Sequence, residues 1–372
     1  MKAILPRHEF QEGLQAVAAL TGGRTTKPIL GCVKMVAVAD ALELSATNGE
    51  QALRLTIPAI SIDQPGEGVV SAERLLSIIR KMPDVEVSLE VKDPHCTIQG
   101  QGRSFRVFVM DPADFPPIGA FEDEPEVVIA GAEFGQMVHL TLYAAARENS
   151  RYAINGVLWE KLDGKMYMVA TDGRRLARAG GTVVEASSGD FEIIIPAKAL
   201  SAFDRVMPAP AGGEAWTVDV KVLPNQVLLR SGGRVLSTVL VEGHFPKYQD
   251  VIPKDGNKRA KLDRAEFFDA VDQAALLTTE DSRAVKLSFS AEQLVITSQS
   301  PEQGDARIEV PIEYEGEPME IGFNPAFVND ALKVVPYDVV SLEMQESFRP
   351  GILYGEDKGE FLYVIMPVSL SQ

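Results

Sequence analysis

The chain has 372 residues, of which 45% are hydrophobic and 24% charged, so it is long and apolar enough for more than one folded domain. Its formal net charge of −17 opposes long-range attraction to nucleic acid, so contact with DNA or RNA needs a local basic surface. No apolar run is long enough for a membrane span, and the N-terminus lacks the apolar stretch of a secretion signal. We therefore expect a cytoplasmic protein with no membrane partner.

The cysteines and histidines do not form a metal-binding pattern. Cys32 and Cys96 lie in unrelated segments, so they build neither a disulfide framework nor a paired metal site. The four histidines lack the i, i+4 spacing of a zinc helix. Neither a metal nor another cofactor is therefore expected.

Helices and strands follow one another along the chain in a pattern typical of α+β domains. Apolar side chains at helical spacing predict six helices, which include residues 10–17, 75–82, 134–141, 200–207, 267–275 and 327–335. Three of them have start signals: Asp263 lies three residues ahead of Glu266, Asn324 precedes Pro325, and a proline stands at Pro196. Alternating segments such as VEVSLEV, FRVFVM and WTVDVKV predict half-buried antiparallel strands, with the helices on one face of each sheet.

Two sequence patterns each occur three times. LELSATNGEQALR, MYMVATDGRRLAR and LVITSQSPEQGDAR share an apolar strand, a threonine, a polar turn and a second strand that ends at arginine. The threonines Thr47, Thr171 and Thr297 recur at intervals of about 125 residues. Segments that begin at Val69, Ile194 and Ile321 repeat a short strand, a helix and a proline stop at the same interval. The repeats predict three domains of like fold, at residues 1–124, 125–253 and 254–372.

The stretch VATDGRRLAR in the second copy has the residue types of an active centre. However, its TDG corresponds to TNG in the first copy and to SPEQG in the third, and Asp-Gly tolerates the positive φ of a tight turn. Asp172 is therefore interpreted first as a hairpin residue. The flank formed by Arg174, Arg175 and Leu176 is specific to the second copy, which favours a functional role for it.

Five segments together resemble one known family. They are GGRTTKPILG, ENSRYAINGVLWE, VATDGRRLA, GHFPKYQDVIP and the terminal YVIMPVSL. The chain resembles the bacterial DNA sliding clamps, the beta subunits of DNA polymerase III, over its whole length. The resemblance implies a ring-forming head-to-tail homodimer with helices lining the inside and antiparallel sheets outside. Such a ring encircles duplex DNA without sequence specificity, as a non-catalytic processivity factor. A clamp loader places it there, and it tethers replicative and repair polymerases.

The resemblance also implies how an acidic protein contacts DNA. If attachment is topological, weak phosphate contacts suffice and allow the ring to slide. The residues expected to face DNA are Arg24, Arg80, Arg147, Tyr152, Lys198 and Arg205. A solvated surface charge is the alternative interpretation for each basic residue among them. The acidic helix that begins at Asp263 is not expected to hold DNA.

Two further surfaces follow from the same resemblance. A cleft between the second and third domains is expected to bind short peptide motifs of partner proteins, and its residues are Arg151, Ile154, Thr171, Gly173, Arg174, Leu176, Pro246, Val251, Phe348, Val364, Met366, Pro367 and Val368. The dimer interface is expected to contain Phe105, Val107, Leu276 and Leu277. An apolar residue in either set could instead belong to a core. A charged substitution at Leu176 or Met366 is expected to abolish peptide binding and leave the ring intact.

Two other classes of function remain open at this point. A metal-dependent enzyme acting on nucleic acid could use Asp172, but no DxD or ExxH cluster accompanies that residue. A scaffold of repeated α+β domains that binds only proteins agrees with the net charge of −17.

Overall fold

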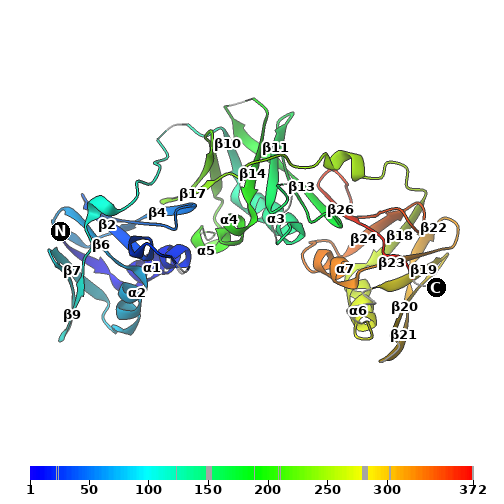
Figure 1. The fold of residues 1–372 in the computed structure, drawn as a ribbon, viewed down its shortest axis with the longest axis horizontal. Coiled ribbons are helices and arrows are strands. Elements are labelled where there is room, and N and C mark those ends of the chain that lie inside the picture. Colours follow the sequence, from blue (N-terminus) through cyan, green and yellow to red (C-terminus); the bar gives the residue numbers. More distant parts are fainter. Residues whose placement is uncertain are drawn as a thin grey trace. The chain divides into compact units, whose positions relative to one another are not determined.

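The structure is a computed structural model that describes residues 1–372 except 22, 24, 123, 148–152, 188, 208, 210, 279–283, 301–302 and 371–372, and except the side chains of 204, 205 and 211. Contacts between Cα atoms divide the chain into two compact units. Unit 1 contains Met1–Ala132, Val183–Gly189 and Lys198–Leu240, and unit 2 contains Glu133–Thr182, Asp190–Ala197 and Val241–Gln372. Each unit combines helices with antiparallel sheets (Figure 1), which confirms the α+β class.

Unit 1 contains two antiparallel sheet arrangements. The first has the order β5 (Ser61–Gln64), β1 (Lys2–Pro6), β7 (Glu86–Lys92), β8 (His95–Gly100) and β9 (Arg103–Phe108). The second has the order β6 (Gly66–Ser71), β2 (Cys32–Val38), β3 (Ala41–Thr47), β4 (Gln51–Pro58), β17 (Arg234–Val239), β16 (Gln226–Ser231), β15 (Thr217–Val222) and β10 (Val127–Ala130). The strand β9 therefore lies at a sheet edge.

The helices α1 (Arg7–Thr21) and α2 (Ala72–Lys81) pack against each other in unit 1, and α1 also packs on β3 and β4. The predicted apolar face of α1 is confirmed, because Phe10, Leu14 and Val17 are all fully buried. The helix expected at residues 200–207 is divided into α4 (Ala197–Ser201) and α5 (Phe203–Val206). Near the break, the Ser201 hydroxyl donates to the carbonyl of Lys198 at 2.8 Å, a local bond that competes with regular helix geometry.

Unit 2 has the same organisation. One antiparallel arrangement has the order β14 (Phe191–Pro196), β11 (Gly156–Leu162), β12 (Lys165–Thr171), β13 (Arg175–Ala186, to Thr182 within the unit), β26 (Phe361–Ile365), β25 (Gly351–Tyr354), β24 (Val339–Met344), β18 (Lys258–Asp263) and β22 (Glu313–Glu315). The other has the order β21 (Gly304–Pro311), β20 (Gln293–Ser300), β19 (Val285–Ser290) and β23 (Met319–Phe323), so β21 lies at a sheet edge.

The helices of unit 2 begin where the sequence predicts. Asp263 caps α6 (Arg264–Ala275) by accepting from the Glu266 amide at 2.9 Å. Asn324 caps α7 (Pro325–Leu332) in the same way, and α6 and α7 pack together.

The described residues also form α3 (Gly131–Thr141) and short 3-10 turns in both units. These turns are η1 (Pro28–Gly31), η2 (Pro112–Asp114), η3 (Leu142–Ala144), η4 (Ala211–Gly213) and η5 (Tyr248–Val251).

Each unit contains a joint at which two strands about 180–190 positions apart in the chain pair. In unit 1, β4 pairs with β17; in unit 2, β13 pairs with β26. Both β4 and β13 follow a hairpin that begins at a repeated threonine, which confirms the first two copies of that pattern. The third copy differs, because Thr297 lies inside β20 opposite Arg307 and the strand continues to Ser300. The strands β20 and β21 meet at Ser300 and Gly304, the ends of the SPEQG segment, so the third copy also has two paired strands but a longer first strand after its threonine.

Candidate functional site

The hairpin between β12 and β13 is an ordinary tight turn. Gly173 has a φ of 85°, which favours glycine, and the Asp172 carboxylate accepts from the amides of Arg174 and Arg175 at 2.9 and 3.1 Å. The other Asp172 oxygen lies 3.0 Å from Nε of Arg175. The interpretation of Asp172 as a hairpin residue is confirmed. Within the part of the chain that the structure describes, no group of three or more His, Cys, Asp or Glu side chains is placed to hold a metal ion.

A buried apolar cluster lies behind this hairpin in unit 2. Three of the expected cleft residues belong to it: Ile154, Leu176 and Val364. Leu176 and Val364 are directly opposed across the β13–β26 pairing, and both are almost completely buried. The two residues come from strands about 190 positions apart in the chain, and the pairing of these strands places two expected cleft residues in direct contact.

Several expected cleft residues of unit 2 are exposed apolar side chains, which are called the rim below. Met366 is 41% exposed and Phe348 is 73% exposed, and Val251 and Val368 are exposed as well. The amide of Met366 donates to the carbonyl of Arg174 at 3.0 Å, so the C-terminal strand continues along the hairpin. A cavity of about 310 Å³ opens next to this rim, and it is lined by Gly322, Ser347, Phe348, Pro367, Val368, Ser369 and Leu370.

The other expected cleft residues have mixed positions. Thr171 is buried at the end of β12, whereas Gly173 and Arg174 are exposed in the hairpin. Pro246 is half-buried and follows the buried Phe245. Arg151 lies outside the described residues.

The sequence analysis missed two features of this region. One is Tyr248, which lies in the buried cluster and donates its hydroxyl to Glu160 at 2.6 Å; burial, followed by this contact, raises the pKa of Tyr248. The other is the ion pair of Arg175, a residue of the noted flank, with Asp330 at 2.7 Å; the Arg175 side chain is only 9% exposed. The segment GHFPKYQDVIP contains Tyr248 and was noticed as a motif. No local signal links Arg175 to Asp330, because they are 155 positions apart.

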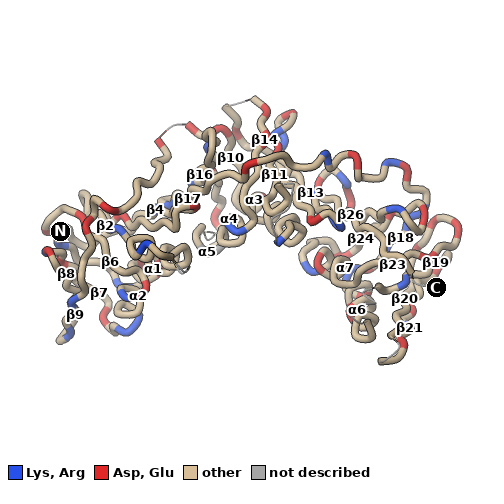
Figure 2. The backbone as a smooth tube through the Cα atoms, viewed as in Figure 1, with Lys and Arg blue, Asp and Glu red and all other residues tan. Residues whose placement is uncertain are grey.

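The residues expected to face DNA are exposed wherever their side chains are described. Arg80 lies in the last turn of α2, Lys198 lies in α4 and Arg147 follows η3. Figure 2 shows such basic positions on α2 and α4, with acidic positions distributed through both units. The backbone of Arg205 lies in α5, and Arg24 and Tyr152 lie outside the described residues.

The residues expected at the dimer interface come from both units. Phe105 is partly exposed on the edge strand β9, with Phe108, which the sequence analysis missed, even more exposed on the same strand. Val107 is 8% exposed and faces the interior of unit 1. In unit 2, Leu276 is 74% exposed directly after α6, and Leu277 is half-buried.

Like α+β domains joined through paired strands are the architecture of a clamp protein. Comparison with known proteins identifies its family. Models of the N-terminal, central and C-terminal domains of the DNA polymerase III beta subunit match residues 1–119, 128–247 and 249–369. The chain therefore belongs to the DNA polymerase III beta subunit family, the sliding clamps, which are non-catalytic processivity factors.

Individual relatives cover the full chain. The beta sliding clamp of Caulobacter vibrioides is 31% identical over 99% of this chain and 100% of the relative, and that of Pseudomonas aeruginosa is 29% identical over 100% of both. The crystal structure of the Pseudomonas aeruginosa DNA polymerase III subunit beta has a TM-score of 0.93 at 28% identity, again with complete coverage of both chains. The Bacillus subtilis sliding clamp has a TM-score of 0.94 at 26% identity and the same coverage. Among the described residues, no helix is long and apolar enough to cross a membrane.

Proposed function

We propose that this chain closes head to tail with a second copy into a ring that encircles duplex DNA and tethers polymerases and repair proteins. The domains are residues 1–124, 125–253 and 254–372. A clamp loader opens the ring and places it on DNA in an ATP-dependent step. The observation that supports this proposal best is the repeated joint, because β4–β17 and β13–β26 connect like domains through the same kind of strand pairing. Since the relatives are bacterial and the ligand is chromosomal DNA, we expect the protein to act in the cytoplasm.

Ring closure needs two complementary edges on one chain. The edge strand β9 exposes Phe105 together with Arg103 and Arg106, and the edge strand β21 exposes Asp305. An unpaired strand edge is a template for pairing with another chain, and opposite charges favour one register. A contact between two different surfaces of identical chains gives a closed ring when the rotation closes. We propose that β9 and Leu276 lie in this interface.

Contacts with DNA in this function are weak and independent of sequence. Arg80, Arg147 and Lys198 are exposed and can reach phosphates, and Arg24, Tyr152 and Arg205 complete the proposed set. Few phosphate contacts give low affinity, which suits a ring that must move along the duplex. The net charge of −17 limits any additional nonspecific binding.

The proposed partner cleft is the exposed rim and hairpin of unit 2. Peptide side chains would pack on Met366, Phe348 and Val251 above the buried cluster that contains Leu176 and Val364. A flexible methionine adapts to peptides that differ in sequence. The full proposed set also includes Arg151, Ile154, Thr171, Gly173, Arg174, Pro246, Pro367 and Val368.

The test is retention of the purified protein on nicked circular DNA after incubation with a bacterial clamp loader and ATP. Encirclement predicts retention on the circle and release once the circle is linearised. The matched control is Leu276→Asp, which is designed to weaken the ring contact and should not be retained on the circle. Equal retention on circular and linear DNA would contradict the ring. A monomeric mass at micromolar concentration would contradict the proposed dimer independently of the loader.

A further inference from the structure

Two hairpins of the chain have the same internal hydrogen bonds. They are Thr47–Gln51 in unit 1 and Thr171–Arg175 in unit 2. Each begins at a threonine whose hydroxyl donates to the carbonyl of the residue four positions later, at 2.8 and 2.6 Å. In each, the glycine amide donates back to the threonine Oγ1, at 3.0 and 3.1 Å. Gln51 and Arg175 are therefore equivalent positions in two copies of one turn.

Arg175 connects its hairpin to other elements of unit 2. Nη1 lies 2.7 Å from a carboxylate oxygen of Asp330 on α7, and Nη2 donates to the carbonyl of Tyr143 at 2.9 Å. Nε contacts Asp172 within the hairpin at 3.0 Å, and the guanidinium lies 4.5 Å from the ring centre of Phe327. Burial alone would lower the pKa of Arg175, but neighbouring groups, which include both carboxylates, outweigh it and raise the pKa.

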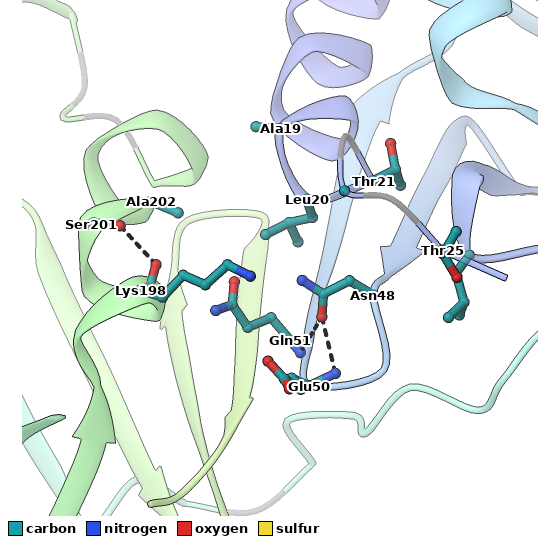
Figure 3. A pocket seen from close by; sticks show the side chains of 12 residues that line it. Ala19, Leu20, Thr21, Thr25, Asn48, Glu50, Gln51, Lys198, Ser201 and Ala202 are labelled. Atoms are coloured by element: carbon teal, nitrogen blue, oxygen red, sulfur yellow. Dashed lines mark hydrogen bonds between the residues drawn. The ribbon is translucent and has the colours of Figure 1, made fainter. Parts of the chain in front are cut away.

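Among the described residues, the equivalent position in unit 1 makes no ionic connection of this kind. Gln51 is uncharged and lies at a cavity of about 320 Å³, whose lining includes Leu20, Asn48, Lys198 and Ala202. Figure 3 shows Gln51, Asn48 and Lys198 converging on this cavity between α1 and α4. The β4–β17 joint next to the cavity is formed nevertheless. The ionic connection is therefore not required for a joint of this type to fold.

We propose that Arg175 is a positioning residue for partner peptides, because it fixes the cleft hairpin against α7. This inference rests on the proposed function of the cleft. The hairpin positions two residues of the proposed peptide surface, Met366 and Leu176. The Met366 amide donates to the Arg174 carbonyl at 3.0 Å, and Leu176 directly follows the turn and lies in the buried cluster. A hairpin without its connection to α7 would shift both parts together, and small misplacements reduce binding because contacts depend on geometry.

The experiment compares peptide binding by three variants of the full-length dimer. Arg175→Gln installs the residue of the first hairpin, Asp330→Asn removes the charge of the partner on α7, and Gln51→Ala is the matched control at the equivalent position. The probe is a fluorescein-labelled peptide with the clamp-binding motif of a bacterial polymerase. Affinity and dissociation rate are measured at a temperature at which circular dichroism shows every variant folded.

Arg175→Gln should raise the Kd of the peptide about tenfold, mainly through faster dissociation, and Gln51→Ala should leave the Kd unchanged. Asp330→Asn should also raise the Kd of the peptide. The double variant should bind the peptide no more weakly than Arg175→Gln alone, since both changes break the same ion pair. Arg175→Lys should restore part of the affinity.

Wild-type affinity in Arg175→Gln would overturn the inference, and so would fully additive losses in the double variant. If Arg175→Gln does not fold, Asp330→Asn decides the question by the same criteria. Failure of the wild-type protein to bind the peptide would instead reject the proposed cleft.

Discussion

Met366→Glu should abolish peptide binding while the dimer stays intact. Met366 is 41% exposed, so a peptide that covers the rest of the side chain gains about 0.8 kcal/mol, if complete burial of a methionine contributes about 2 kcal/mol. A glutamate loses this gain, and its carboxylate must also give up water, which costs about 1–3 kcal/mol. The total of about 2–4 kcal/mol raises the Kd roughly 30-fold to 1,000-fold. Fluorescence anisotropy with a labelled peptide measures the loss.

The chain provides a matched control at Val239. Its amide donates to the Glu50 carbonyl at 2.9 Å, in the same way as Met366 donates to Arg174, and it is 43% exposed. Val239→Glu should therefore have a similar effect on stability and none on peptide binding. Leu176 is a poor site for this test, because it is 3% exposed and a charge there would disrupt the core. Unchanged affinity in Met366→Glu, or equal losses in both variants, would refute the assignment of Met366 to the cleft.

Three further predictions concern stability and assembly. Burial alone would raise the pKa of Glu343, but Lys358 and other cationic neighbours hold this pKa below the ordinary 4.5. The ionised Glu343 therefore stabilises the fold fully above pH 4.5, and this stabilisation is lost as the pH falls through the lower pKa of the folded state. Urea unfolding of Glu343→Gln should accordingly show a smaller loss of stability in acid than the wild type. Leu276→Asp should weaken the dimer about tenfold or more in analytical ultracentrifugation, because a charge replaces a 74% exposed apolar side chain at the proposed interface. Gly131→Ala should lower the free energy of unfolding by about 1–3 kcal/mol, since its Cβ would overlap the Trp216 indole; an unchanged melting curve would contradict that packing.

Much of the local structure follows from the sequence. Periodic apolar positions locate α1 and α6, and the caps at Asp263 and Asn324 form the predicted bonds. These features depend on neighbours within one turn of helix, so a short window of sequence contains the relevant physics. The TDG turn is equally local, because its bonds connect residues two to four positions apart.

Long-range features are not predictable in this way. The sequence predicts strands β13 and β26 but not that they pair, or that Leu176 faces Val364 in that register. The position of Arg175 depends on α7, which is 155 residues away at Asp330. In the third copy, the first strand continues three residues past Thr297 to Ser300, where the SPEQG segment begins. Similar residues predict a similar element, whereas strand length depends on the partner strand.

The differences between the copies indicate where function is concentrated. Both joints need a strand pairing and a tight turn, and both hairpins supply them with the same hydrogen bonds. At the last residue of the turn, one copy has neutral Gln51 beside a cavity and the other has Arg175 buried against Asp330 and Tyr143. A buried arginine that must keep several partners adds little net stability over a well-packed alternative. Stability of the joint alone therefore does not account for the ionic cluster, whereas a fixed position for the neighbouring Arg174 and Leu176 does.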